Sequence, residues 1–277
     1  MKLSVSMYCY VRAVQEGRLD LVGFVREAKR IGADGVELLD FFYKDPNSER
    51  EAVKAALVEN GLPCPIFSVA NNFVKPTAEE RSAQTDRIRF GVDEAVFYGA
   101  QTVRVFAGDV TEGVTFEQAR TWIVDGLAVA ADYAQERGKR LALENHGKLA
   151  GRSDQVRGLI EDVRAKCGHD AMCANPDTGN FVLVDQDSLE AVGDLAEVAA
   201  MVHFKDFVRG PGPYVSLAGT AFQGTVIGEG EVDLGGCVAA LKQRGFQGWL
   251  SLEYEGTGDP FGEVEKSVRN CRTILVP

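Results

Sequence analysis

The chain has 277 residues and a formal net charge of −11, with 41 acidic and 30 basic side chains. This acidic balance works against long-range attraction to phosphate backbones and to anionic lipids, so the sequence predicts no nucleic-acid partner and no membrane partner. A chain of this length is typical of an α/β barrel that folds as one unit and buries a large core.

Strand-like and helix-like apolar patterns alternate along the chain. Strands are predicted at 3–9, 35–39, 64–70, 102–107, 140–146, 171–177, 200–204 and 248–253, and helices at 20–32, 48–61, 77–99, 115–138, 153–168, 187–198, 234–245 and 263–275. Ser48 and Thr77 each precede a glutamate by three residues, which predicts a capping box at the start of two helices. The stretch 208–231 is rich in glycine and contains two prolines, so an irregular, lid-like loop is predicted there.

Eight strand–helix units follow one another without a linker or a change of composition. This repetition predicts a single (β/α)8 TIM barrel over residues 1–277. A doubly wound open sheet is the alternative, but no Gly-rich dinucleotide turn follows the first strand or any other.

Cysteine usage and the amino-terminal composition bear on location. The six cysteines are scattered without a CxxC pair or a zinc-finger spacing, so reduced core residues are predicted. Polar residues interrupt the first twelve positions, and no later stretch has the length of a membrane span. We therefore expect a cytoplasmic protein.

Four predicted strands in succession end in a potential metal ligand, namely Glu144, Asp177, His203 and Glu253. The sequence separations correspond to one strand–helix unit each, with the 208–231 stretch added in the last step. Because the carboxyl ends of barrel strands converge on one mouth, these side chains are predicted to form one site for a divalent ion. Three carboxylates and one imidazole suit Mn²⁺, Mg²⁺ or Co²⁺, and Zn²⁺ is a further alternative.

A divalent ion in this site would hold two adjacent oxygens of a hydroxy-ketone and stabilise the enediolate that forms when the neighbouring carbon loses a proton. Glu144 and Glu253, on strands separated by two others, are predicted as the base and acid pair. The predicted activity is isomerisation or epimerisation of a small carbohydrate, a keto-sugar or keto-cyclitol. The alternatives are a lyase or dehydratase that begins with the same proton abstraction, and a sugar-binding barrel without catalysis.

Further residues are predicted to contact the substrate. Lys205 and His146 lie two residues after His203 and Glu144, so each is expected on the same side of its strand as that ligand. His146 either binds substrate or orients Glu144, and Arg209 either binds substrate hydroxyls or lies on the surface. Other candidates at or near strand ends are Tyr8, Glu37, Asn71, Arg104 and Asn180.

Five motifs resemble those of the xylose isomerase-like TIM-barrel superfamily of sugar phosphate isomerases and epimerases. They are Leu-Glu-Asn-His at 143–146, Asp-Thr-Gly-Asn at 177–180, His-Phe-Lys-Asp at 203–206, Gly-Glu-Gly-Glu-Val-Asp at 228–233 and Leu-Glu at 252–253. The resemblance implies that Glu144, Asp177, His203 and Glu253 bind one divalent ion, commonly Mn²⁺. It also implies that Glu144 and Glu253 exchange the substrate proton.

Within this superfamily the motifs are most similar to those of ketose 3-epimerases and of inosose isomerases and dehydratases. The resemblance implies a substrate contact for Arg209, whereas Asn180 stands where the ketose epimerases usually have a histidine. The His-x-Lys-Asp form is closer to the inosose branch, which keeps the lyase alternative open. Abasic-site endonucleases share the superfamily but use a histidine-rich zinc cluster, and this chain has three histidines. Barrels of the family often form dimers or tetramers, so a homo-oligomer is compatible with the sequence.

Overall fold

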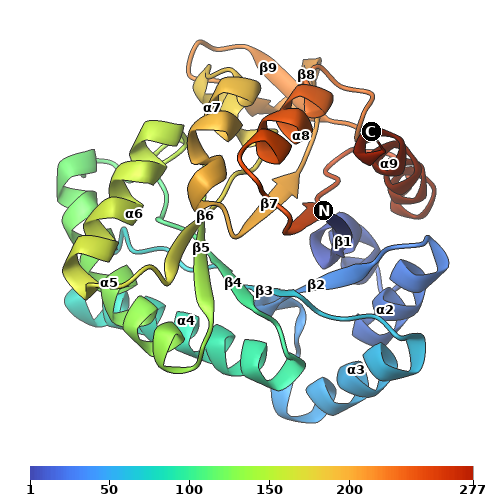
Figure 1. The fold of residues 1–277 in the computed structure, drawn as a ribbon, viewed down its shortest axis with the longest axis horizontal. Coiled ribbons are helices and arrows are strands. Elements are labelled where there is room, and N and C mark those ends of the chain that lie inside the picture. The colour runs from blue at the N-terminus through green and yellow to red at the C-terminus, as the bar shows by residue number, and fades with distance from the viewer. Residues whose placement is uncertain (277) are drawn as a thin grey trace.

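Eight parallel strands form a nearly closed barrel in the computed structural model, which describes residues 1–276 (Figure 1). The order around the barrel is β6-β5-β4-β3-β2-β1-β10-β7, and isolated bridges at Ala174–Ala199 and Asp177–His203 connect the segments that contain β6 and β7. The predicted (β/α)8 barrel is confirmed. The barrel strands are β1 (Lys2–Ser6), β2 (Gly35–Leu39), β3 (Ile66–Ser68), β4 (Thr102–Val105), β5 (Arg140–Glu144), β6 (Met172–Asn175), β7 (Met201–Phe204) and β10 (Trp249–Leu252).

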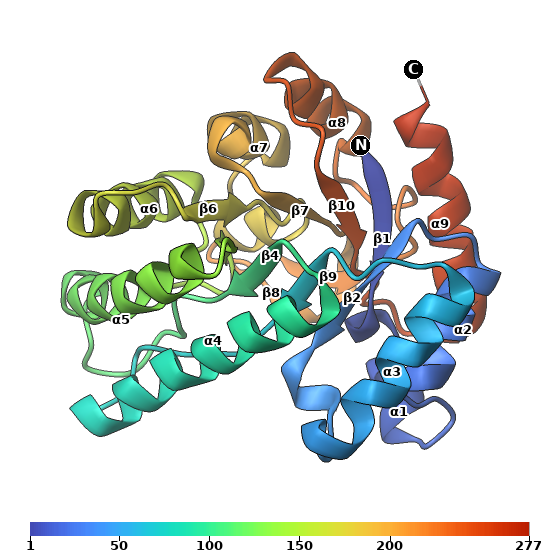
Figure 2. The same cartoon turned by 60° about the horizontal axis from the view of Figure 1, so that its bottom comes forward.

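Helices lie around the outside of the barrel (Figure 2). None of the helices among residues 1–276 combines the length and the apolar character needed to cross a membrane. The α-helices are α1 (Val11–Gln15), α2 (Leu21–Arg30), α3 (Pro46–Asn60), α4 (Ala78–Tyr98), α5 (Phe116–Glu136), α6 (Ser153–Cys167), α7 (Ser188–Leu195), α8 (Leu234–Gln243) and α9 (Pro260–Leu275). Short 3-10 helices cover Met7–Tyr10, Asp40–Phe42, Asn180–Val184 and Ala196–Val198.

One of the two predicted capping boxes is present. The Thr77 hydroxyl accepts a hydrogen bond from the Glu80 backbone N–H at 3.2 Å, and the Glu80 carboxylate accepts one from the Thr77 N–H at 3.1 Å. The prediction for Ser48 is wrong, because α3 begins at Pro46 with Asp45 as its N-cap. Proline suits the first turn of a helix, where its missing N–H would have no partner.

The predicted irregular loop at 208–231 also needs correction. Strands β8 (Phe207–Val215) and β9 (Ala221–Gly224) form an antiparallel hairpin with a register shift between Arg209 and Tyr214. The two prolines are tolerated because each strand of a two-stranded sheet has a free edge that needs no N–H donor. Asp206 accepts hydrogen bonds from the backbone of Gly228, Gly230 and Val232, so the segment after the hairpin is held against the end of β7.

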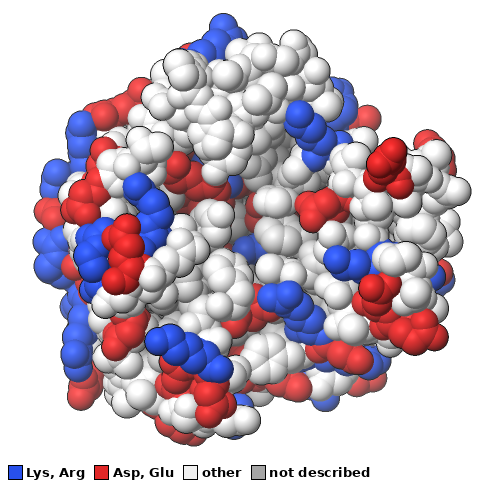
Figure 3. Space-filling model, turned by 180° about the vertical axis from the view of Figure 1, so that it is seen from behind, with Lys and Arg blue, Asp and Glu red and all other residues white. Residues whose placement is uncertain are grey.

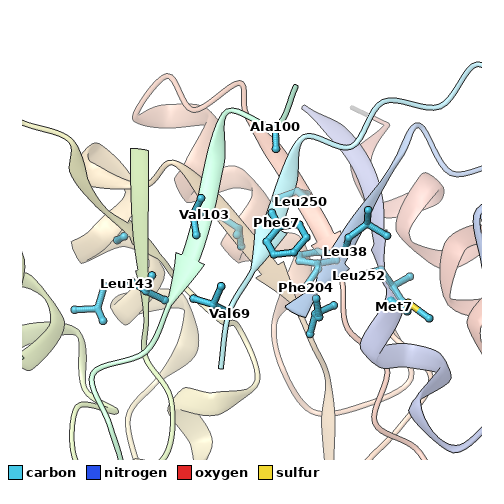
Figure 4. Packing of buried hydrophobic residues seen from close by; sticks show 14 of the residues in the cluster. Met7, Leu38, Phe67, Val69, Ala100, Val103, Leu143, Phe204, Leu250 and Leu252 are labelled. Atoms are coloured by element: carbon cyan, nitrogen blue, oxygen red, sulfur yellow. The ribbon is translucent and has the colours of Figure 1, made fainter. Parts of the chain in front are cut away.

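Along the barrel strands, side chains that pack in the apolar core alternate with polar side chains that point into the barrel. Leu38, Phe67, Val103 and Leu143 belong to a large buried cluster that also contains the inner residues of the helices (Figure 4). A small separate cluster contains Ile66, Ala142 and Met201. Because strand side chains alternate between faces, the intervening polar residues project into the barrel. These buried polar residues are Glu37, Ser68, Arg104, Glu144, His203 and Ser251.

Helix α5 packs so closely on Phe73 that Gly126 has no room for a side chain. A Cβ at Gly126 would overlap the ring of Phe73, which is fully buried. We expect Gly126→Ala to lower the free energy of unfolding by about 1–3 kcal/mol, measured by urea denaturation, because the ring must shift in a packed core. Gly193→Ala in α7 is the matched control, since a Cβ there meets nothing within 4 Å and a helical alanine is favoured over glycine. Equal destabilisation of both variants would contradict this packing argument.

Candidate active site

The four side chains predicted as metal ligands converge at the carboxyl ends of the barrel strands. Glu144, Asp177, His203 and Glu253 are all buried, and one ligand atom from each lies within 4.8 Å of the other three. His203 Nδ1 is 3.0 Å from Glu144 Oε2, 3.6 Å from Glu253 Oε2 and 3.8 Å from Asp177 Oδ2. The structure thus brings together residues that are 109 positions apart in the sequence.

Two atoms of this cluster have charged neighbours but no hydrogen bond of proper geometry. They are Asp177 Oδ2 and His203 Nδ1, both inaccessible to solvent. A buried polar atom without a hydrogen bond is costly, and a cation placed between these two atoms would satisfy both. The donor set of carboxylate oxygens and one imidazole nitrogen fits a divalent cation.

The His203 ring is oriented from behind by Glu37. Its Nε2 lies 3.1 Å from both carboxylate oxygens of Glu37, and the hydroxyls of Ser68 and Ser251 donate to the same carboxylate. Burial opposes ionisation of Glu37, but His203 holds the pKa of Glu37 below its usual value. Burial opposes a charge on His203, but Glu37, Glu253 and Glu144 raise its pKa well above the usual value, so the ring is protonated beside these carboxylates. A cation that displaces the Nδ1 proton would bind Nδ1, while the Nε2–H still donates to Glu37. The structure therefore places Glu37 behind the cluster and not in the lining of a cavity.

We expect Glu37→Gln to weaken binding of Mn²⁺ by about 10–100-fold, because the neutral amide holds the His203 tautomer less firmly. Isothermal titration calorimetry of the purified protein with Mn²⁺ measures this change in affinity. Glu59→Gln on the exposed side of α3 is the control and should bind as the wild type does. An unchanged affinity in Glu37→Gln would show that Glu37 does not orient a ligand.

Glu144 is held by three neighbouring side chains. Arg104 Nε lies 3.3 Å from Glu144 Oε2, and the amides of Asn175 and Asn180 donate to the two carboxylate oxygens at 3.2 Å each. Burial alone would raise the pKa of Glu144, but the positive charges of His203 and Arg104 lower it to about 2. Glu144 is therefore ionised, and Asn180, predicted as a substrate contact, donates a hydrogen bond to this carboxylate.

The Asp177 carboxylate is fixed by its own turn. Its Oδ1 accepts the backbone N–H groups of Gly179 and Asn180 at 2.9 Å each, and the Asn145 side chain hydrogen-bonds both the N–H and the carbonyl of Asp177. These bonds leave Oδ2 directed toward the cluster. Burial, together with repulsion from Glu144 and Glu253, raises the pKa of Asp177 to about 7. Glu144 and Glu253 are thus close enough to Asp177 to oppose its ionisation, although Lys205 and His203 favour it.

Lys205 lies beside the cluster, as its position two residues after His203 predicts. Its Nζ is 2.6 Å from Glu253 Oε2, 2.9 Å from Glu255 Oε1 and 3.0 Å from Asp177 Oδ2. Burial opposes its charge, but these carboxylates raise the pKa of Lys205 well above its usual value. Lys205 and His203 hold the pKa of Glu253 at about 2 against the effect of burial.

A cavity of about 180 Å³ opens onto the cluster, and we call it the reaction cavity. Figure 3 shows a hollow near the middle of one face, with charged side chains in and around it. The His146 ring packs on Phe106 at a centroid distance of 4.2 Å, and burial lowers the pKa of His146, so the ring is neutral. The cavity is lined by Tyr8, Leu39, Phe41, Ala70, Arg104, Phe106, Glu144, His146, Lys205, Glu253 and Glu255.

Two predicted candidates lie elsewhere. Arg209 is in β8, where its side chain is 69% exposed, pairs with Glu231 and lines a different cavity of about 400 Å³. Arg209 lies there because pairing of β8 with β9 directs its side chain away from the cluster. Asn71 is buried and joins two loops through the backbone N–H and carbonyl of Phe106.

Glu255, Phe106 and Asn175 are among the residues at the site that the sequence predictions missed. Glu255 follows Glu253 by two residues, and the same period-two argument that identified Lys205 would have found it. Asn175 also lies two residues before Asp177. Phe106 follows β4 directly, but an aromatic residue there has no signal that separates a cavity wall from the core.

Comparison with known proteins gives relatives along most of the chain. The L-ribulose-5-phosphate 3-epimerase UlaE of Salmonella paratyphi C is 25% identical over 267 residues, which cover 88% of this chain and 86% of the relative. Two solved structures share the fold. The IOLI protein with a bound zinc atom has a TM-score of 0.78 and 16% identity, covering 99% of this chain and 98% of the other. The D-psicose 3-epimerase of Clostridium cellulolyticum, solved with D-tagatose, has a TM-score of 0.77 and 14% identity, covering 99% of each chain.

A sequence model of one family accounts for nearly the whole chain. The xylose isomerase-like TIM barrel family matches residues 25–274. This match includes Glu144, Asp177, His203 and Glu253, and also Arg104, Lys205 and Glu255 from the reaction cavity. The chain therefore belongs to the xylose isomerase-like TIM barrel family.

Proposed function

We propose that the protein is a divalent-metal-dependent isomerase or epimerase that acts on a keto-sugar or keto-cyclitol by proton transfer. The observation that carries this proposal is the pair of ionised carboxylates, Glu144 and Glu253, in one cavity beside two buried atoms without hydrogen bonds. The names of relatives support the same reaction class, since UlaE is a ribulose-phosphate epimerase and a fold neighbour is a psicose epimerase.

Glu144, Asp177, His203 and Glu253 are the residues that would hold the ion. When bound, a divalent ion supplies positive charge that polarises a substrate carbonyl and makes the neighbouring C–H more acidic. We propose Mn²⁺, because three carboxylates and one imidazole form a mainly oxygen donor set. The zinc atom of the IOLI structure makes Zn²⁺ the first alternative to test, followed by Mg²⁺ and Co²⁺.

The two carboxylates of the pair serve as base and acid in turn. Glu144 and Glu253 are both ionised, so either has an oxygen that can accept a proton from a carbon that the cavity presents to it. Return of a proton to the opposite face of that carbon gives an epimer, and return to the neighbouring carbon gives an isomer. The charges of Lys205 and Arg104 lie in the same cavity, where they would stabilise the negative oxygen of the enediolate.

Incubation of a panel of ketoses and inososes with the Mn²⁺-loaded protein in D₂O tests this proposal. An isomeric product with deuterium at the carbon that exchanged its proton is expected. Net loss of water or of a leaving group from the β position would replace the proposal by the lyase alternative. The absence of metal-dependent turnover on every member of the panel would contradict both.

A further inference from the structure

A second cavity of about 220 Å³ adjoins the reaction cavity. Tyr8 and Glu255 line both, so the two cavities meet at these side chains. We call the second space the tyrosine cavity; its lining includes Tyr8, Val11, Tyr214, Tyr254, Glu255 and Thr257. None of the four clustered ligands lines it.

The size of the two cavities indicates that they act together. Ligand sites in proteins usually have volumes of about 300–1,000 Å³, and each of these cavities is smaller than that range. Only the two together reach it. A substrate that fills both cavities extends beyond the cluster, and the part of it that reacts occupies only the reaction cavity.

The Glu255 carboxylate has a polar partner on the side of each cavity. It pairs with Lys205 Nζ at 2.9 Å on the side of the cluster and accepts a hydrogen bond from the Tyr214 hydroxyl on the other side. Three tyrosine side chains then surround the outer space. Aromatic rings of this kind pack well against the faces of another ring and offer few polar groups to an ion.

Lys205 and Arg104 line the reaction cavity, where they contact carboxylates, and neither lines the tyrosine cavity. Arg12, the one cation that lines the tyrosine cavity, donates to the carbonyls of Thr257, Gly256 and Gly258. A phosphate in the tyrosine cavity would therefore meet Glu255 and no free cation among residues 1–276, which disfavours it.

We propose that the substrate is an uncharged keto-sugar derivative whose reacting ring is joined to a second ring or an aromatic group in the tyrosine cavity. This inference rests on the proposed function and narrows its substrate class. Free ketoses lack the group that fills the tyrosine cavity, and sugar phosphates bring a charge that nothing there neutralises. Both are weaker substrates than a glycoside that keeps a free ketone away from its anomeric carbon.

The experiment compares keto-aldoses, whose ketone is not the anomeric carbon, in three forms, namely free, phosphorylated and as the phenyl glycoside, with Mn²⁺ and D₂O. Burial of a phenyl ring predicts a kcat/KM at least about tenfold higher for the phenyl glycoside than for the free sugar. Val11→Trp and Thr257→Trp fill the tyrosine cavity and should each reduce this preference by about tenfold or more. Val58→Trp, at an exposed position of α3, is the matched control and should keep the preference.

Melting temperatures of the three variants show whether each is folded, and the exposed position of Thr257 makes its replacement the safer of the two. If free or phosphorylated sugars exchange solvent deuterium as fast as the phenyl glycosides, the inference is wrong although the proposed function stands. The same conclusion follows if both folded tryptophan variants keep the preference. If no form of any sugar exchanges deuterium, the proposed function itself fails.

Discussion

Replacement of Glu144 or Glu253 by glutamine should lower kcat for the sugar substrate by about 100-fold or more, because a glutamine amide cannot accept the substrate proton. Both carboxylates are ionised and line the reaction cavity, one held by Arg104, Asn175 and Asn180 and the other by Lys205. The measurement is turnover with saturating Mn²⁺, together with the rate at which solvent deuterium enters unreacted substrate and product.

Each glutamine variant also removes a negative ligand, so the metal content of each must be measured alongside. Deuterium exchange into unreacted substrate distinguishes loss of an acid–base group from loss of the metal. A variant that lacks one acid–base group can still exchange the substrate proton through the other carboxylate, although it forms no product. Glu229→Gln is the control: this exposed carboxylate pairs with Lys266 and stands in the Gly-Glu-Gly-Glu motif outside the reaction cavity. Full turnover in Glu144→Gln and Glu253→Gln with metal bound would refute their assignment as the proton-transfer pair.

Asp177→Asn should abolish stable binding of the divalent ion. Asp177 Oδ2 is buried beside Glu144, His203 and Glu253 without a hydrogen bond, and an amide in its place removes one negative charge from the ligand set. Elemental analysis after dialysis should give close to one ion per chain for the wild type and far less for the variant. Activity with added Mn²⁺ should fall in parallel.

The thermal stability of Asp177→Asn gives a second readout. When a chelator has removed the metal, burial and two neighbouring carboxylates oppose a charge on Asp177. The melting temperature of the variant should then equal or exceed that of the wild type. Mn²⁺ at about 100 times its Kd should stabilise the wild type by about 2.7 kcal/mol and leave the variant unchanged.

Asp206→Asn is the contrasting control for this experiment. This buried carboxylate accepts three backbone N–H groups, so its replacement should lower stability by about 1–3 kcal/mol while metal binding persists. A normal metal content in Asp177→Asn would remove Asp177 from the ligand set.

Much of the barrel could be predicted from local patterns. Apolar periodicity and helix-terminal residues such as Thr77 are properties of a few neighbouring positions, so the order of strands and helices follows from them. The hairpin within 207–224 could not, because Phe207–Val215 becomes a strand only by pairing with Ala221–Gly224, and its glycines and prolines are typical of loops.

The positions of four polar residues at the ends of successive strands were sufficient to place Glu144, Asp177, His203 and Glu253 at one mouth, because parallel barrel strands point the same way. Only the tertiary structure decided what surrounds them. Glu37 contacts His203 although 166 positions separate them in the sequence, and the hairpin places Arg209 outside the reaction cavity. Glu255 lines both the reaction cavity and the tyrosine cavity. These outcomes depend on which strands and loops become neighbours in space, and side-chain alternation within one strand carries no information about that.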